Sequence, residues 1–228
     1  MKTRLAALLS IIAITALVSC KNNDSVFTKT VSTSLNVVNA SANNINFYLN
    51  GTRQNNSSAL TPGGQTFYLT VPAGVQNFQI KKDGSADYLI SIPLNLKDSV
   101  YHSLYIAGET LDNTLVTVDT IGYDTIASHK NNFQLRFVHT TPGAGAFDVK
   151  VGDTLKFHSE FKTSSAFLSI GSGLKEIKVY DAGSTIPRID TIVSLSPKKG
   201  YTIYTVGKLT GTGGSKFKLG VALNFNTQ

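Results

Sequence analysis

Short stretches in which apolar and polar residues alternate run through the chain from residue 34 onward. In the first of them, Leu35 and Val37 share one face and Asn36 lies on the other. Residues 45–49 repeat the alternation, and turns rich in Gly, Asn and Asp separate the stretches. Alternation with a period of two predicts β-strands with one buried face, and no stretch has the period of a helix. The pattern predicts an all-β protein with about seven strands in each half.

The pattern of the first half returns in the second half, which indicates an internal duplication. Matching positions share the apolar alternation and the turn glycines, whereas the polar residues between them differ. The alignment pairs residues 35–41 with 135–141, residues 69–74 with 168–173, and Tyr101 with Tyr201.

Each half has about 90 residues, which is enough for a hydrophobic core of its own. We therefore expect two antiparallel β-sandwich domains in tandem, either immunoglobulin-like or transthyretin-like. The first domain is expected at 34–120 and the second at 133–228. Residues 121–132, which have little apolar period, are the expected linker.

The beginning of the chain has the features of a targeting signal. A basic start precedes an apolar run, residues 5–18, that is shorter than the roughly 20 residues of a membrane-spanning helix. Residues 17–20, Leu-Val-Ser-Cys, resemble the lipobox of bacterial lipoproteins. That resemblance implies that residues 1–19 are removed and that Cys20, the only cysteine, carries lipid such as palmitate. We expect this lipid to anchor the protein to a membrane; an ordinary secretory signal is the alternative.

Residues 20–33 are rich in Lys, Asn, Ser and Thr and have no apolar period. They are expected to form a flexible tether with a reach of roughly 20 Å. Lys21 follows the cysteine. In the sorting rule of such lipoproteins, an aspartate at this position retains the protein at the inner membrane, so we expect the outer membrane. The sequence leaves open which leaflet carries the protein.

Basic residues outnumber acidic ones by 21 to 14 in the whole chain. The excess lies in the second half, because residues 133–228 hold 12 basic and 6 acidic residues and residues 34–120 hold 4 and 6. A basic domain at a membrane could face anionic headgroups or an acidic polysaccharide. The lysines are scattered, however, which favours an ordinary solvated surface. Nucleic acid is not an expected partner of an exported protein.

The start of each half carries a more specific resemblance. Residues 135–151, Leu-Arg-Phe-Val-His-Thr-Thr-Pro-Gly-Ala-Gly-Ala-Phe-Asp-Val-Lys-Val, resemble the opening of the envelope family called domain of unknown function 4397. Residues 35–51 keep the first strand and the Asn-Ala-Ser bend but lack the proline and the aspartate. The resemblance implies a Bacteroidetes-type lipoprotein with two β-sandwich copies. It implies no established activity and supplies no catalytic residue.

No group of residues has the spacing of a catalytic or metal site. Residues 171–173 lack the spacing of a nucleophile elbow. His139 aligns with Asn39, which favours a polar bend residue that bonds the nearby backbone. We therefore expect no metal, no cofactor and no enzyme, with a hydrolase as a further alternative. None of the four histidines forms a metal-ligand motif: His102, His129, His139 and His158.

These observations favour a non-enzymatic lipoprotein with a structural or accessory role in the cell envelope, where an envelope protein would be its partner. A surface glycan-binding module is the alternative. Tyr68 and Phe167 occupy the same repeat position and are expected on the outer face of a strand, where aromatic rings could stack on sugars. Packing between the two domains would explain a repeated outer aromatic residue equally well.

Six tripeptides read Asp, then Ser or Thr, then an aliphatic residue. The tripeptide is similar to the acceptor for O-glycosylation of exported Bacteroidetes proteins. A turn followed by a strand also produces this sequence, so both explanations stay open. The candidate acceptors are Ser25, Ser99, Thr120, Thr125, Thr154 and Thr191.

Overall fold

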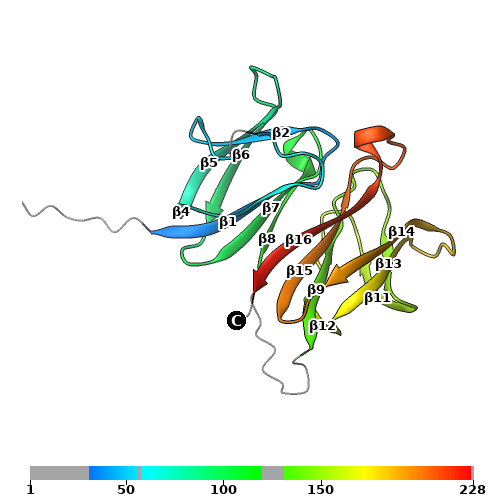
Figure 1. Ribbon diagram of the computed structural model, residues 1–228. Coiled ribbons are helices and arrows are strands. Elements are labelled where there is room, and N and C mark those ends of the chain that lie inside the picture. The colour runs from blue at the N-terminus through cyan, green and yellow to red at the C-terminus, as the bar shows by residue number, and fades with distance from the viewer. Residues whose placement is uncertain (1–30, 56–57, 120–130, 227–228) are drawn as a thin grey trace, which may run out of the picture. The chain divides into compact units, whose positions relative to one another are not determined.

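The computed structural model describes residues 31–55, 58–119 and 131–226 (Figure 1). The predicted signal peptide, Cys20, most of the tether and most of the linker lie outside these residues, so they stay predictions. Within the described ranges the chain forms sixteen β-strands, two short 3-10 turns and no α-helix. The turns are η1 (Leu111–Asn113) and η3 (Gly213–Ser215).

The first half is a sandwich of two four-stranded sheets. The strand order is β4-β1-β7-β8 in one sheet and β3-β2-β5-β6 in the other. The strands are β1 (Ser32–Asn39), β2 (Ile45–Leu49), β3 (Thr52–Arg53), β4 (Gln65–Pro72), β5 (Gly74–Lys82), β6 (Ile90–Leu96), β7 (Tyr101–Ile106) and β8 (Thr114–Val118).

The second half repeats this arrangement. Its sheets have the strand orders β12-β9-β15-β16 and β11-β10-β13-β14. The strands are β9 (Asn132–Val138), β10 (Phe147–Val151), β11 (Thr154–Ser159), β12 (Leu168–Gly171), β13 (Gly173–Asp181), β14 (Pro187–Leu195), β15 (Lys199–Val206) and β16 (Lys218–Asn226).

The all-β, two-sandwich prediction is confirmed, with one difference in each half. β1 pairs with β7 in parallel, and β9 pairs with β15 in parallel, whereas the remaining pairs of the sheets are antiparallel. Alternation predicts which face of a strand is buried, but it carries no information about the direction of a strand that comes much later in the chain.

Each half has its own core between its two sheets. Leu35 and Val37 of β1 and Phe47 of β2 are fully buried in the first core, as the alternation predicts. Phe137 and Val149 occupy the matching places in the second core. The turns that separate the strands use glycine where the backbone is left-handed, for example Gly51, which has φ +81°.

The strand register confirms the repeat but shifts one of its pairs. Leu35 lies opposite His102 on β7, whereas Leu135 lies opposite Tyr201 on β15. His102 is therefore the counterpart of Tyr201, and the predicted match of Tyr101 with Tyr201 is wrong by one residue. The identical residue types at Tyr101 and Tyr201 favoured the wrong pair. The preceding strands agree with the pair His102 and Tyr201, because Leu96 lies opposite Gly74 and Leu195 lies opposite Gly173.

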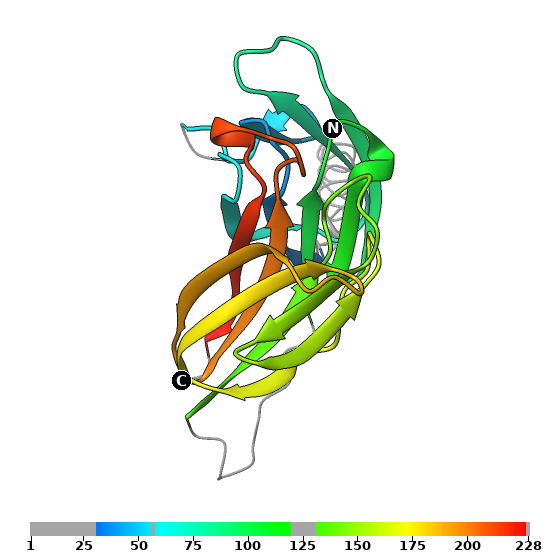
Figure 2. The ribbon, with the colours of Figure 1, turned by 90° about the vertical axis from the view of Figure 1, so that its right-hand side faces the viewer.

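The two halves pack against each other through the sheets that contain β1 and β9 (Figures 1 and 2). Tyr105 and its counterpart Tyr204 meet edge to face, with ring centroids 5.7 Å apart. The hydroxyl of Tyr204 donates to the carbonyl oxygen of Gly63 at 2.9 Å. Both halves belong to one compact unit. The interface cluster consists of Val38, Ala40, Tyr105, Val138, Tyr204, Val206 and Ala222.

Candidate functional site

An aromatic and basic cluster lies on the outer face of the sheet that contains β2 and β5. Phe47 and Ile80 point into the core, so the next residues along each strand, Tyr48 and Lys81, point outward. Tyr88 comes from the loop between β5 and β6 and is 45% exposed. We call Tyr48, Lys81 and Tyr88 the tyrosine platform.

The three side chains of the platform hold one another in place. The rings of Tyr48 and Tyr88 meet edge to face, with centroids 5.8 Å apart. The Lys81 ammonium lies 4.4 Å from the centroid of Tyr88 and 5.3 Å from that of Tyr48, and it donates to the carbonyl oxygen of Ala86 at 2.6 Å. Such cation–π contacts stabilise the ring positions. The platform is therefore an ordered aromatic surface.

Amide side chains surround the tyrosine platform. Asn46, which lies directly opposite Lys81, donates to the carboxylate of Asp83 at 3.1 Å. Gln79 lies opposite Tyr48, and its buried Oε1 has no hydrogen-bond partner among the described residues. A buried carbonyl oxygen without a donor is uncommon, because its desolvation costs free energy. Because the atom is buried, a ligand on the outer face does not reach it, and it is an unsatisfied acceptor beside the platform.

Among its described residues, the second half has no complete counterpart of this platform. Lys150 and Tyr180 occupy the places of Tyr48 and Lys81 with the residue types exchanged, and the Lys150 ammonium lies 5.2 Å from the Tyr180 ring. Tyr180 is buried, and the loop before β14 supplies exposed Ile186 where the first half has Tyr88. Polar contacts occupy much of this face, for example the ion pair of Lys178 with Glu176 at 2.8 Å and the hydrogen bond of Asp148 with His158 at 2.7 Å.

Of the two aromatic residues predicted as ligand contacts, Tyr68 lies at the interface between the halves, and Phe167 packs within the second half beside the interface residue Arg136. The Tyr68 hydroxyl donates to Asp119 at 2.5 Å and accepts from Asn224 at 3.2 Å. The Phe167 ring lies 4.7 Å from the guanidinium carbon of Arg136. The contact of Tyr68 with Asn224 favours the alternative interpretation of the sequence, packing between the halves. Their role toward a ligand stays a prediction.

The interface contains a buried ion pair that the sequence did not reveal. Arg136 of β9 donates to Asp119, which follows β8, and both side chains are almost fully buried. Asp119 also accepts from Ser103 at 2.6 Å and from Thr117 at 3.0 Å. Burial and the nearby Asp119 carboxylate raise the pKa of Tyr68 above its ordinary value, so this tyrosine stays a neutral donor.

The bend role predicted for His139 is confirmed. Its Nε2 lies 2.9 Å from the carbonyl oxygen of Gly145, and its Nδ1 accepts from the backbone N–H of Thr141. Asn39, its counterpart, accepts from the backbone N–H of Ser41 in the same way. Among the described residues, no group of three or more His, Cys, Asp or Glu side chains could hold a metal ion.

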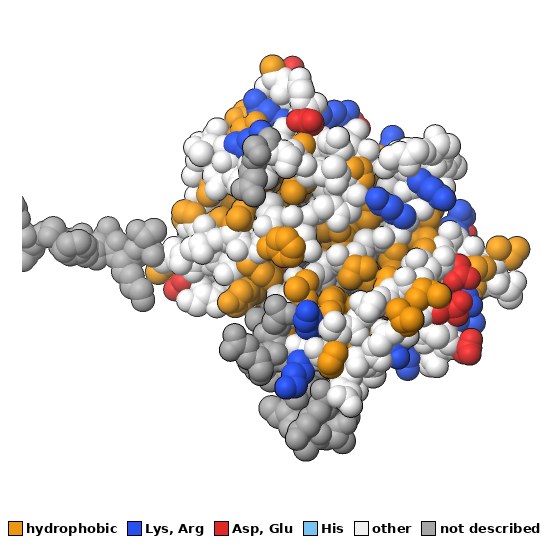
Figure 3. Space-filling model, in the orientation of Figure 1, with side chains coloured by type: hydrophobic (Ala, Val, Ile, Leu, Met, Phe, Trp, Pro, Cys, Tyr) orange, Lys and Arg blue, Asp and Glu red, His pale blue; other side chains and the backbone are white. Residues whose placement is uncertain are grey.

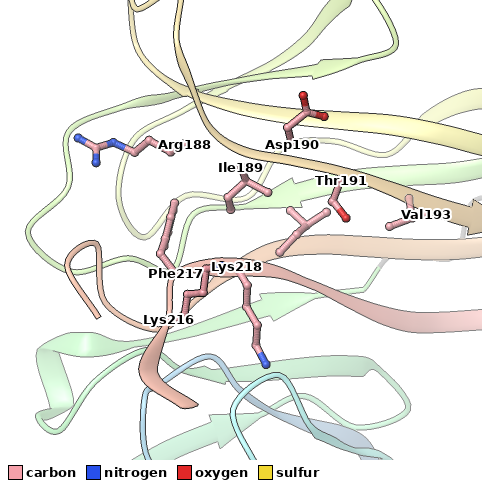
Figure 4. A pocket seen from close by; sticks show the side chains of 9 residues that line it. Arg188, Ile189, Asp190, Thr191, Val193, Lys216, Phe217 and Lys218 are labelled. Carbon is pink, nitrogen blue, oxygen red and sulfur yellow. The ribbon is translucent and has the colours of Figure 1, made fainter. Parts of the chain in front are cut away.

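A groove of about 460 Å³ lies between β14 and the segment that leads into β16 (Figure 4). Ile189 and Phe217 supply apolar walls. The charged ends of Arg188, Asp190 and Lys218 point in different directions (Figure 4). Charges that diverge in this way do not form a binding site for one anion. The groove marks the place where β14 of one sheet lies beside β16 of the other.

The predicted O-glycosylation acceptors have different environments. Ser99 is exposed in the tight turn before β7, and Thr154 is exposed as the first residue of β11. Thr191 is half-buried on β14 and lines the groove beside that strand. Ser25, Thr120 and Thr125 lie outside the described residues. Accessibility therefore favours Ser99 and Thr154 among the acceptors that the structure describes.

Basic side chains are scattered on the face of the molecule that Figure 3 draws. In the view of Figure 3 they appear in several separate places and do not form one continuous patch. Hydrophobic side chains are likewise distributed over this face. Within the ranges that the structure describes, no helix is long and apolar enough to cross a membrane.

The fold defines the class of this protein: it consists of two β-sandwich repeats. Comparison with family models places the chain in one family: it belongs to the domain of unknown function family DUF4397, which matches residues 33–150 and 133–224. The two matches are consistent with two copies, as the sequence predicted. No curated protein matches the chain.

One solved structure with a similar outline is a carbohydrate-binding module of family CBM26 from Eubacterium rectale Amy13K, in complex with maltoheptaose. It is 8% identical, and the match covers 86% of this chain and 97% of that chain with a TM-score of 0.28. A TM-score this low does not establish a common fold.

Proposed function

We propose that this protein is a non-catalytic accessory protein of the bacterial cell envelope that binds glycans through the tyrosine platform of its first half. A lipid on Cys20 would hold it at the outer membrane. The observation that carries the proposal is the ordered surface formed by Tyr48, Tyr88 and Lys81, with amide groups beside it.

The chemistry of this surface fits a sugar ring. The C–H groups on one face of a sugar pack against aromatic rings, and its hydroxyl groups donate to and accept from amides. Tyr88 offers exposed ring surface on this sheet face. The contacts of Lys81 keep both rings ordered before binding, which lowers the entropic cost of binding.

A structural role in the envelope is the second candidate function. The halves are joined through a buried interface that contains the ion pair of Arg136 with Asp119 and the contact of Tyr105 with Tyr204. A rigid two-sandwich body of this kind suits a spacer or a scaffold for an envelope protein. Crosslinking in intact cells would identify such a partner.

A binding screen of residues 31–228 tests the glycan proposal. The probes are neutral polysaccharides (starch, xylan, mannan and mixed-linkage glucan) and acidic ones (pectin, alginate and hyaluronan), in affinity gels followed by calorimetry. We expect selective binding that falls at least tenfold in Tyr88→Ala, because one stacking ring is removed. Tyr101→Ala is the matched control, since Tyr101 is a 42% exposed tyrosine on another sheet. Absence of binding across the panel, or equal loss in both variants, would refute the proposal.

A further inference from the structure

Phe67 has a backbone conformation that aromatic residues rarely adopt. Its φ is +57°, in the left-handed region, and its side chain is 58% exposed. For a bulky residue this region is unfavourable, and residues kept there cluster at functional sites. Because the exposed ring contributes little to the core, packing does not explain why a phenylalanine occupies the position.

The fold itself does not require a left-handed residue at this place. Thr66 accepts the backbone N–H of Val37 at 2.9 Å, and Ser165 accepts that of Phe137 at 3.0 Å, so the two halves have the same local bond. The residue that follows Ser165 is Ala166, which is not among the positive-φ residues. The left-handed backbone conformation at this position therefore occurs in the first half and not at the matching residue of the second half.

Phe67 lines a groove of about 230 Å³ beside the edge strand β4. Gln54 and Gln65 line the same groove. The amide nitrogen of Gln54 donates to the carbonyl oxygen of Thr52, and the amide oxygen of Gln65 accepts from Asn36. Each amide has a second polar atom, the oxygen of Gln54 and the nitrogen of Gln65. An exposed ring beside a donor and an acceptor is a surface that suits a sugar.

We propose that this groove is a second carbohydrate contact, and that the ligand is therefore an extended glycan chain bound along its length and not a single terminal sugar. This inference rests on the proposed function of the tyrosine platform. It adds that Phe67 is a ligand-contacting residue whose conformation costs stability.

The wall of the groove is bonded to the strand that carries the platform. The backbone N–H of Gln54 donates to the carbonyl oxygen of Phe47 at 2.8 Å, directly beside Tyr48. The side chain of Asn55 donates to Asn46 at 3.1 Å. Paired segments lie about 4.8 Å apart, so the near wall of the groove is about one strand spacing from β2. A chain of several sugar units can reach from one contact to the other.

The test combines a stability measurement with a chain-length series. The variants of residues 31–228 are Phe67→Gly, Phe67→Ala and Tyr88→Ala. The probes are malto-, cello-, xylo- and galacturono-oligosaccharides, each from disaccharide to octasaccharide, measured by calorimetry. Glycine adopts a left-handed φ without strain, so Phe67→Gly should raise the thermal midpoint by about 2–4 °C. A purely structural phenylalanine would give a lower midpoint instead.

For the wild type we expect affinity to rise about tenfold or more from the disaccharide to the octasaccharide of the series that binds. Phe67→Gly and Phe67→Ala should abolish this rise and leave the disaccharide affinity unchanged, whereas Tyr88→Ala should weaken binding at every length. If the phenylalanine variants bind every length like the wild type while Tyr88→Ala fails, the groove takes no part and only the proposed function stands. If the wild type binds no oligosaccharide, both proposals fail.

Discussion

Removal of the Asp119 carboxylate should destabilise both halves together. In the native protein this carboxylate accepts from Arg136 across the interface, from Tyr68 at 2.5 Å and from Ser103 at 2.6 Å. The substitution Asp119→Ala leaves the buried guanidinium without a counter-charge and leaves the hydroxyl donors without their acceptor. Arg136 keeps bonds to Thr202 at 2.8 Å and to the carbonyl oxygen of Val118 at 3.2 Å, which compensate only in part.

The expected loss in the free energy of unfolding is large for one substitution. Removal of one partner of a buried ion pair costs about 3–5 kcal/mol, because the remaining charge stays desolvated. The total stability of a domain is only about 5–15 kcal/mol, so this loss is a large fraction of it. In Arg136→Met/Asp119→Ala the uncompensated charge is gone. We therefore expect the double variant to lose at least about 1.5 kcal/mol less than the sum of the two single losses.

Urea unfolding of residues 31–228, followed by circular dichroism and by tyrosine fluorescence, measures these values. We expect one transition in both probes, because the interface couples the two sandwiches. Asp148→Ala is the matched control, since Asp148 pairs with His158 on an exposed sheet face and should cost less than about 1 kcal/mol. A loss below about 1 kcal/mol in Asp119→Ala, or additive losses in the double variant, would refute the reasoning.

Two further predictions concern pH and modification. Burial lowers the pKa of His139, so the unfolded chain takes up a proton near pH 6.5 that the native imidazole does not. Stability is therefore present above about pH 6.5 and is lost as the pH falls toward the lower native pKa, by at most about 1.4 kcal/mol per pH unit. His139→Asn, which copies the residue of the first half, should lose less stability between pH 7.5 and pH 5 in urea titrations, and equal losses would contradict the assignment. If Ser99 or Thr154 carries a glycan, the intact mass of the natively expressed protein should exceed the mass of the peptide from Cys20 plus its lipid. The double variant Ser99→Ala/Thr154→Ala should lose this excess mass. A native mass equal to peptide plus lipid would contradict the hypothesis.

Much of the fold was predictable because its signals are local. The alternation around Leu35 and Phe47 specifies which side of each strand is apolar, and turn glycines such as Gly51 specify where a strand ends. The repeat predicts that the second half folds like the first, and the register of Leu69 with Leu35 and of Leu168 with Leu135 agrees with it. These features depend on residues close together in the chain, so the sequence alone determines them.

The tertiary structure decided what covers each outer face. Asn36 and Tyr68 occupy outward positions of their strands, yet the second half packs over them, whereas Tyr48 occupies the same kind of position and stays at the surface. Alternation with a period of two predicts which face of a strand points into the core of its own sandwich. It does not predict whether another sheet packs on the opposite face. The pairing of Arg136 with Asp119 joins residues from different halves, and the left-handed backbone of Phe67 is not repeated at Ala166, which is why only the structure shows these two features.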